Sequence, residues 1–127
     1  MKALLDTHTF LWAISDDPRL SRQARQAFTG PSDLWLSVAS IWEILIKVKA
    51  GKLPLPEPAG PYIVRKLGDN RIEVLPIKLD HVLKIENLAV HHRDPFDRIL
   101  IAQSLEEKLP LVTADPIFER YAVDVIW

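Results

Sequence analysis

Four acidic residues have the chemistry and the positions expected of a metal site: Asp6, Glu43, Asp97 and Asp115. Carboxylates that are held close together repel one another, which raises their pKa values or requires a cation between them. A set of oxygen ligands without cysteine favours a hard ion such as Mg²⁺ or Mn²⁺. Ions of this kind activate water for attack on phosphorus, and a second ion can stabilise the leaving oxygen. The pattern therefore favours metal-assisted phosphodiester hydrolysis with one or two ions.

Each acid, taken alone, also has a purely structural explanation. Asp94 and Asp115 directly precede prolines, which is typical of a helix N-cap followed by proline at the first helical position. Asp97 would be the third residue of such a helix, where the helix dipole favours a carboxylate. Asp6 is also a possible N-cap. The metal hypothesis therefore depends on whether the acids converge.

The hydrophobic pattern predicts the elements that would bring them together. Apolar runs predict strands over 2–5, 34–38, 72–75 and 111–113, with a possible edge strand over 123–126. Caps and apolar spacing predict helices near 10–14, 21–28, 39–50, 61–67, 79–88 and 95–108, and a short helix after Asp115. Prolines make 53–58 an extended connector. Alternating strands and helices indicate an α/β fold, in which helices flank a central, mostly parallel sheet of four or five strands.

This arrangement places the four acids at one edge of the sheet. Asp6 directly follows the first strand, and Asp115 follows the fourth strand after a single alanine. Glu43 lies one turn into the helix after the second strand. Asp97 lies in the first turn of the helix that leads back into the fourth strand. Because ligands bind beyond the carboxyl ends of parallel strands, we expect a site there.

Five further polar residues are candidates for orienting ligands or contacting substrate: Thr7, Ser40, Asp94, Arg98 and Thr113. Capping or strand packing explains the threonines equally well, and a helix cap is the simpler role for Asp94. Arg98, beside Asp97, and Lys47, one turn after Glu43, could each hold a phosphate. A surface ion pair explains Lys47 at least as well.

Composition excludes several other classes of protein. The 127 residues suit one domain, 1–127, and the absence of cysteine excludes disulfides, thiolate metal sites and a cysteine nucleophile. There is no glycine-rich phosphate loop, zinc signature or serine triad motif. The adjacent His91 and His92 are not expected to bind metal together. The short apolar run at the N-terminus does not resemble a signal peptide, and no apolar stretch approaches the ~20 residues that span a bilayer. These features predict a cytoplasmic protein without membrane contact.

Four segments resemble PIN domains: LLDTH at 4–8, SIWEI at 40–44, DPFDRILIAQ at 94–103 and LVTAD at 111–115. More narrowly, the chain resembles VapC-type toxins of toxin–antitoxin pairs, over essentially its whole length. The resemblance implies a PIN-like three-layer fold in which Asp6, Glu43, Asp97 and Asp115 bind Mg²⁺ or Mn²⁺. It also implies an endoribonuclease acting on structured RNA such as tRNA, a homodimer, and inhibition by a cognate antitoxin. Antitoxins of this family lay a helix beside the site, and Phe10, Trp12 and Trp42 could supply an apolar wall for it.

Two alternatives belong to other functional classes. A receiver-like signalling domain would need a phosphoacceptor aspartate at the end of a central strand, but the strand at 34–38 runs into Ala39 and Ser40, and the third strand ends at Pro76. A PIN-like fold kept only for binding RNA or protein is the second alternative. The presence of all four acids argues against it.

Overall fold

The computed structural model describes residues 1–127. Five strands form one wholly parallel sheet in the order β3-β2-β1-β4-β5. The strands are β1 (Lys2–Leu5), β2 (Asp33–Ser37), β3 (Ile72–Leu75), β4 (Leu111–Val112) and β5 (Val125–Ile126). The α-helices are α1 (Thr7–Ile14), α2 (Arg22–Thr29), α3 (Val38–Lys49), α4 (Ala59–Asp69), α5 (Leu79–Lys84) and α6 (Pro95–Glu107). Two 3₁₀ helices, η1 (Ile85–Asn87) and η2 (Pro116–Arg120), complete the chain.

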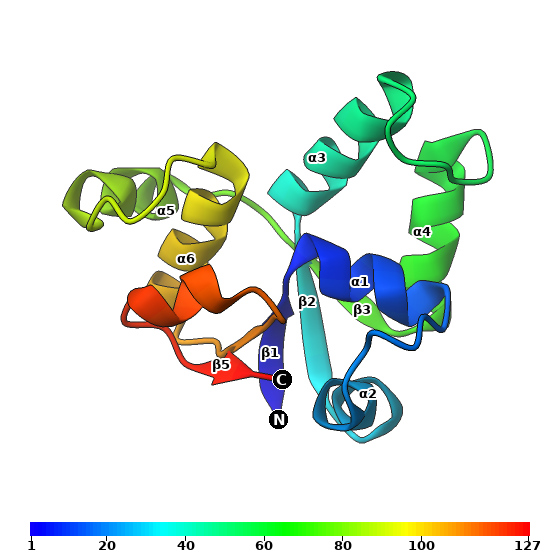
Figure 1. The fold of residues 1–127 in the computed structure, drawn as a ribbon, viewed down its shortest axis with the longest axis horizontal. Helices are drawn as coiled ribbons and strands as arrows, with labels where there is room; N and C mark the ends of the chain where they lie inside the picture. Colours follow the sequence, from blue (N-terminus) through cyan, green and yellow to red (C-terminus); the bar gives the residue numbers. More distant parts are fainter.

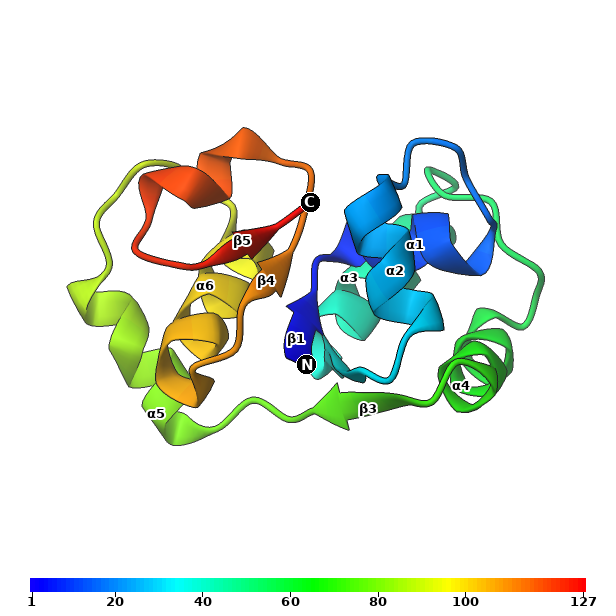
Figure 2. The same cartoon turned by 90° about the horizontal axis from the view of Figure 1, so that it is seen from below.

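Helices cover both faces of the sheet, which confirms the predicted three layers. Successive strand side chains point to opposite faces. Leu5 packs on one face with Phe10 of α1 and Ile44 of α3, whereas Leu4 packs on the other face with Leu100 of α6. Figure 2 looks along the layers and shows α1 to α4 on one side of the sheet and α5 and α6 on the other. β1, with three fully buried residues, lies at the centre.

The predicted elements are present, with differences at their ends. The helix predicted over 79–88 is α-helical only to Lys84 and continues as the 3₁₀ helix η1, and the helix after Asp115 is the 3₁₀ helix η2. Short terminal turns commonly tighten in this way to i→i+3 hydrogen bonds. α4 is longer than predicted and begins at Ala59. α3 ends before Gly51, whose φ of +72° is the left-handed conformation that glycine adopts at little cost.

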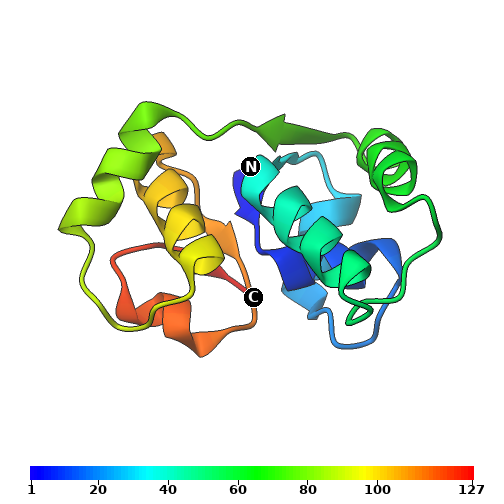
Figure 3. The same cartoon turned by 90° about the horizontal axis from the view of Figure 1, so that it is seen from above.

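Because all strands are parallel, their carboxyl ends lie at the same edge of the sheet. β1 and β2 run upward in Figure 1, and α1 and α3 begin at their upper, carboxyl ends near the middle of the picture. Figure 3 looks down on this edge and shows α3 and α6 on either side of it. None of the helices combines the length and the apolar character that a bilayer-crossing segment needs.

Candidate metal centre at the carboxyl edge of the sheet

Asp6 is fixed by the two strands at the centre of the sheet. Its backbone N–H donates to the carbonyl of Val112 at 3.0 Å, which extends the β1–β4 pairing by one residue. The Thr113 hydroxyl donates to Asp6 Oδ2 at 2.9 Å, and both residues are buried. Although Asp6 stands at the N-cap position of α1, its side chain makes no capping hydrogen bond. The capping explanation is therefore wrong for Asp6, and Thr113 orients its carboxylate.

Glu43 lies on the buried side of α3, which begins at the end of β2. The Thr7 hydroxyl donates to Ser40 Oγ at 2.9 Å and so joins the first turns of α1 and α3 below it. Glu43 is 7% exposed, and Lys47 Nζ lies 3.1 Å from its Oε2. The predicted ion pair with Lys47 is thus present, and the ammonium offsets part of the negative charge of Glu43.

Asp94 and Asp97 occupy the first turn of α6. Asp94 Oδ1 accepts hydrogen bonds from the N–H groups of Phe96 and Asp97, at 2.9 and 3.1 Å, which confirms Asp94 as the N-cap. Asp97 is the third helical residue, and its side chain is 20% exposed. Its Oδ2 lies 3.3 Å from His92 Nε2.

Asp115 lies on the exposed side of the site, just beyond β4. Its Oδ1 accepts a hydrogen bond from Ile117 N–H at 3.0 Å, so the predicted cap is present. Its own N–H donates to Thr113 Oγ1 at 3.1 Å. Thr113 therefore connects two of the four acids, which is the supporting role expected of it.

The acids act on one another electrostatically. Burial, followed by the charges of Asp94, Asp6, Glu43 and Asp115, raises the pKa of Asp97 to about 7. Burial also raises the pKa of Asp6, against the opposing effect of the Thr113 hydrogen bond and of His8. Asp97 is therefore affected by the charges of the other three predicted acids, and Asp6 by that of Glu43.

The donors suit a hard divalent cation, because they are carboxylate and hydroxyl oxygens with excess negative charge. The acidic side chains lie farther apart than the ligands of a bound ion do. No group of three or more acidic or histidine side chains is placed closely enough to hold an ion. The residues present therefore fit Mg²⁺ or Mn²⁺ in chemistry and charge, and binding would require side-chain rotation.

Two sequence-based assignments need correction. Phe10 is fully buried between α1 and the sheet, so it cannot supply a wall for a partner. The Arg98 Nη1 donates to the carbonyls of Ala89 and His92 and to the Tyr121 hydroxyl, which favours a structural role over a phosphate contact. Trp12 is partly buried under Arg19, whereas Trp42 is 60% exposed beside Phe96.

Sequence reasoning missed two residues next to the acids. His92 contacts Asp97, and Tyr121 contacts His92 from 29 positions away. His92 lies only five residues before Asp97, so proximity in sequence was a signal. Tyr121 offered none, because the contact depends on how η2 packs against the loop before α6.

Comparison with known proteins identifies the family. The sequence model of the PIN domain family matches residues 3–124. Ribonuclease VapC16 of Mycobacterium tuberculosis is 40% identical over 50 residues, which are 39% of this chain and only 34% of that protein. Among solved structures, DNA-bound VapBC2 from Rickettsia felis gives a TM-score of 0.73 at 14% identity, covering 98% of this chain and 97% of the other. DNA-bound VapBC from Salmonella typhimurium gives 0.70 at 18% identity, covering 98% and 96%. Such identities show a shared fold, and the family match shows that the chain belongs to the PIN domain family.

Proposed function

We propose that this chain is a metal-dependent endoribonuclease, in which Asp6, Glu43, Asp97 and Asp115 hold one or two Mg²⁺ or Mn²⁺ ions. The observation that carries the proposal is the pKa of Asp97, which burial and four neighbouring carboxylates raise to about 7. A fold gains nothing from such repulsion unless a cation relieves it. The name of the partial relative, a ribonuclease, supports RNA as the substrate.

The residues of the chain prepare the site in a definite way. The Thr113 hydroxyl donates to Oδ2 of Asp6, which leaves Oδ1 without a side-chain hydrogen bond and able to bind an ion. Asp94 fixes the first turn of α6 and thereby the backbone of Asp97. When bound, the ion would supply an activated water and positive charge beside the leaving oxygen. The carboxylates would orient that water for attack on a phosphodiester.

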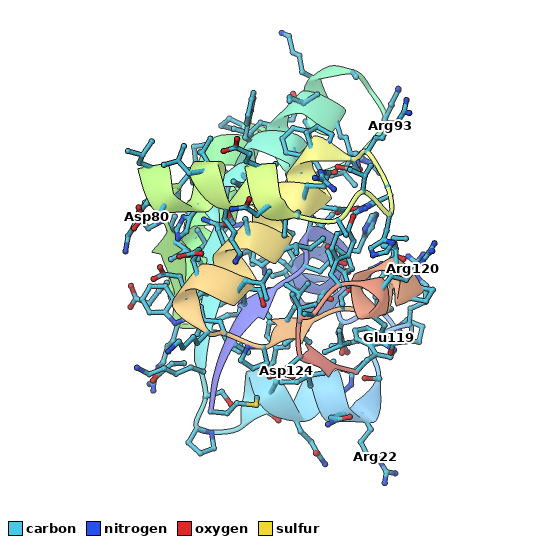
Figure 4. All side chains as sticks on the ribbon, turned by 90° about the vertical axis from the view of Figure 1, so that its left-hand side faces the viewer. Arg22, Asp80, Arg93, Glu119, Arg120 and Asp124 are labelled. Carbon is cyan, nitrogen blue, oxygen red and sulfur yellow. The ribbon has the colours of Figure 1, made fainter.

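Exposed arginines near the site are better candidates for RNA contacts than the cations named from sequence. Lys47 is paired with Glu43, and Arg98 binds backbone carbonyls. Arg93, beside the Asp94 cap, and Arg120 of η2 are exposed and form no ion pair, and Figure 4 shows both pointing outward. We propose that they contact backbone phosphates, which position RNA without reading its sequence.

We further propose a cognate antitoxin and a homodimer as partners. The solved structures that share the fold include complexes named as toxin–antitoxin pairs. On this chain, α3, α5 and the start of α6 border an apolar hollow of about 240 Å³. It is lined by Ala39, Trp42, Ile77, Val82, Pro95, Phe96 and Ile99. An exposed apolar surface of this kind is typical of a protein interface.

The proposed activity is tested with the purified chain, Mg²⁺ or Mn²⁺ and structured RNA such as tRNA. Asp6→Asn and Asp97→Asn should each reduce cleavage by at least about a hundredfold, because each removes charge that the ion needs. Asp80→Asn, an exposed acid on α5 away from the site, is the matched control and should cleave normally. If the two site variants cleave as the wild type does, the assignment is wrong. RNA binding without cleavage by the wild type would instead support the non-catalytic module.

A further inference from the structure

A chain of two hydrogen bonds links Tyr121 to Asp97 through His92. The Tyr121 hydroxyl lies 2.8 Å from His92 Nδ1, and His92 Nε2 lies 3.3 Å from Asp97 Oδ2. The side chains of His92 and Asp97 are 18% and 20% exposed, and Tyr121 is buried at 8%. Neither His92 nor Tyr121 has a role in the site described above.

The donors around Tyr121 determine where the protons lie. Its oxygen accepts the N–H of His91 at 3.3 Å and Arg98 Nη1 at 3.2 Å, and both groups can only donate. A phenol oxygen that accepts two hydrogen bonds has its own O–H left to give. That proton points to His92 Nδ1, which must therefore accept it. His92 then carries its ring proton on Nε2, facing Asp97.

We infer that His92 and Tyr121 are positioning residues for Asp97, acting through a fixed tautomer of His92. The Nε2–H of His92 donates to Oδ2 of Asp97 and leaves Oδ1 free to bind an ion. Carboxylates that bind metal ions are commonly held in position by hydrogen bonds from neighbouring groups. The ring of His92 also packs against Phe118 and Tyr121, at centroid distances of 6.4 and 5.5 Å, so η2 sets its direction.

Arg98 belongs to the same group of contacts. Its Nη1 binds Ala89, His92 and Tyr121 together, so it fastens the loop before α6 to η2. Two of the acidic side chains are therefore oriented in the same way, by a hydrogen bond to one carboxylate oxygen. Thr113 orients Asp6, and the pair His92–Tyr121 orients Asp97.

The tautomer is tested directly by ¹⁵N NMR of the imidazole rings in the metal-free chain. Spectra are recorded at increasing pH until the ring ¹⁵N shifts no longer change, and the tautomer is assigned from that plateau. We expect His92 to carry its proton on Nε2 in the wild type and to show a mixture of tautomers in Tyr121→Phe. A proton on Nδ1 in the wild type, or an unchanged spectrum in the variant, would overturn the inference.

The effect on the site is measured as Mn²⁺ affinity, with free Mn²⁺ counted by electron paramagnetic resonance. Tyr121→Phe keeps the buried ring and should weaken Mn²⁺ binding about tenfold, as His92→Phe should. His92→Gln restores an N–H donor and is expected to recover part of the lost affinity. His91→Gln is the matched control, because the His91 ring only packs against Tyr121. Its affinity should be unchanged.

The inference rests on the proposed function, but the two can fail separately. If the wild type neither binds Mn²⁺ nor cleaves RNA, the proposed function fails, while the NMR result still decides the tautomer. If the wild type does both, and Tyr121→Phe and His92→Phe match it in Mn²⁺ affinity, the positioning role is wrong and the nuclease stands. A role for the pair in holding Asp97 should also change the metal concentration needed for half-maximal cleavage without changing the KM for RNA.

Discussion

The ionised carboxylate of Asp97 destabilises the folded chain, because it is partly buried and lies among other carboxylates. Its pKa is raised to about 7, so the folded chain keeps this proton to a higher pH than the unfolded chain does. The contribution of Asp97 to stability is therefore complete below about pH 4 and is lost as the pH rises toward 7. Above that range, in the absence of metal, the ionised group destabilises the fold.

Asp97→Asn should therefore stabilise the metal-free chain at pH 8. We expect the free energy of unfolding to rise by about 1–3 kcal/mol, because relief of the burial penalty and of the repulsion exceeds the roughly 0.3–1 kcal/mol lost from the helix dipole. The measurement is chemical denaturation in chelator, at pH 8 and at pH 5. At pH 5 Asp97 is already protonated, so the gain should nearly disappear. An equal loss of stability at both values would favour a purely structural role.

Asp94 and Asp115 allow capping to be separated from metal binding. Both accept backbone N–H groups at helix starts, and asparagine caps as well as aspartate does. Asp94→Asn and Asp115→Asn should thus each change stability by less than about 0.5 kcal/mol. Only Asp115→Asn should lose RNA cleavage, by tenfold or more. Equal activity of the two variants would reduce Asp115 to a cap.

The sequence contained the information for the caps and for the acids, since Asp-Pro pairs and strand ends are local signals. It could not show the tertiary contacts between polar side chains. His92, Tyr121 and Arg98 meet only because η2 folds back over the loop before α6. The burial of Phe10 was equally hidden, because the short helical run at 10–14 did not reveal which face of α1 the sheet would cover.

The strands and helices were predictable because each depends on residues within or next to it in the sequence. Apolar runs gave the strands, and serine, aspartate and glycine gave helix ends such as Ser21, whose side chain accepts the N–H of Ala24. The start of α5 at Leu79 was predicted, whereas its end at Lys84 was not predictable from such signals. α5 has only six residues, and a buried histidine connects it to α6.

His81 is expected to determine whether α5 stays attached. It is fully buried, accepts the N–H of Lys78 at 3.0 Å and lies 3.1 Å from Glu107 of α6. His81→Leu removes the acceptor of the Lys78 N–H and leaves Glu107 with only the Lys78 ammonium, so it should cost about 2 kcal/mol in urea unfolding. Glu106→Gln, which affects only a surface pair with Lys84 at 3.9 Å, should cost less than about 0.5 kcal/mol. Similar losses in both variants would show that α5 depends little on His81.

Exposed apolar side chains on α3 and α5 favour an interface with another chain. Val82 is 49% exposed at the apolar hollow, whereas Val64 is 67% exposed on α4, at the opposite end of the molecule in Figure 1. If a homodimer uses this hollow, Val82→Glu should elute as a monomer in light-scattering chromatography, because it would bury an unpaired charge. Val64→Glu is the control and should remain dimeric. A dimer that survives Val82→Glu would place the interface elsewhere.

We propose that the PIN fold of this chain gathers four carboxylates that hold a catalytic ion. The most direct measurement is the rate of RNA cleavage by the purified chain as Mn²⁺ is removed by chelator and then restored. We expect cleavage by the wild type to stop in chelator and to return with added Mn²⁺ or Mg²⁺, whereas Asp6→Asn should not recover it. Cleavage that continues in chelator, or that returns equally in Asp6→Asn, would contradict the proposal.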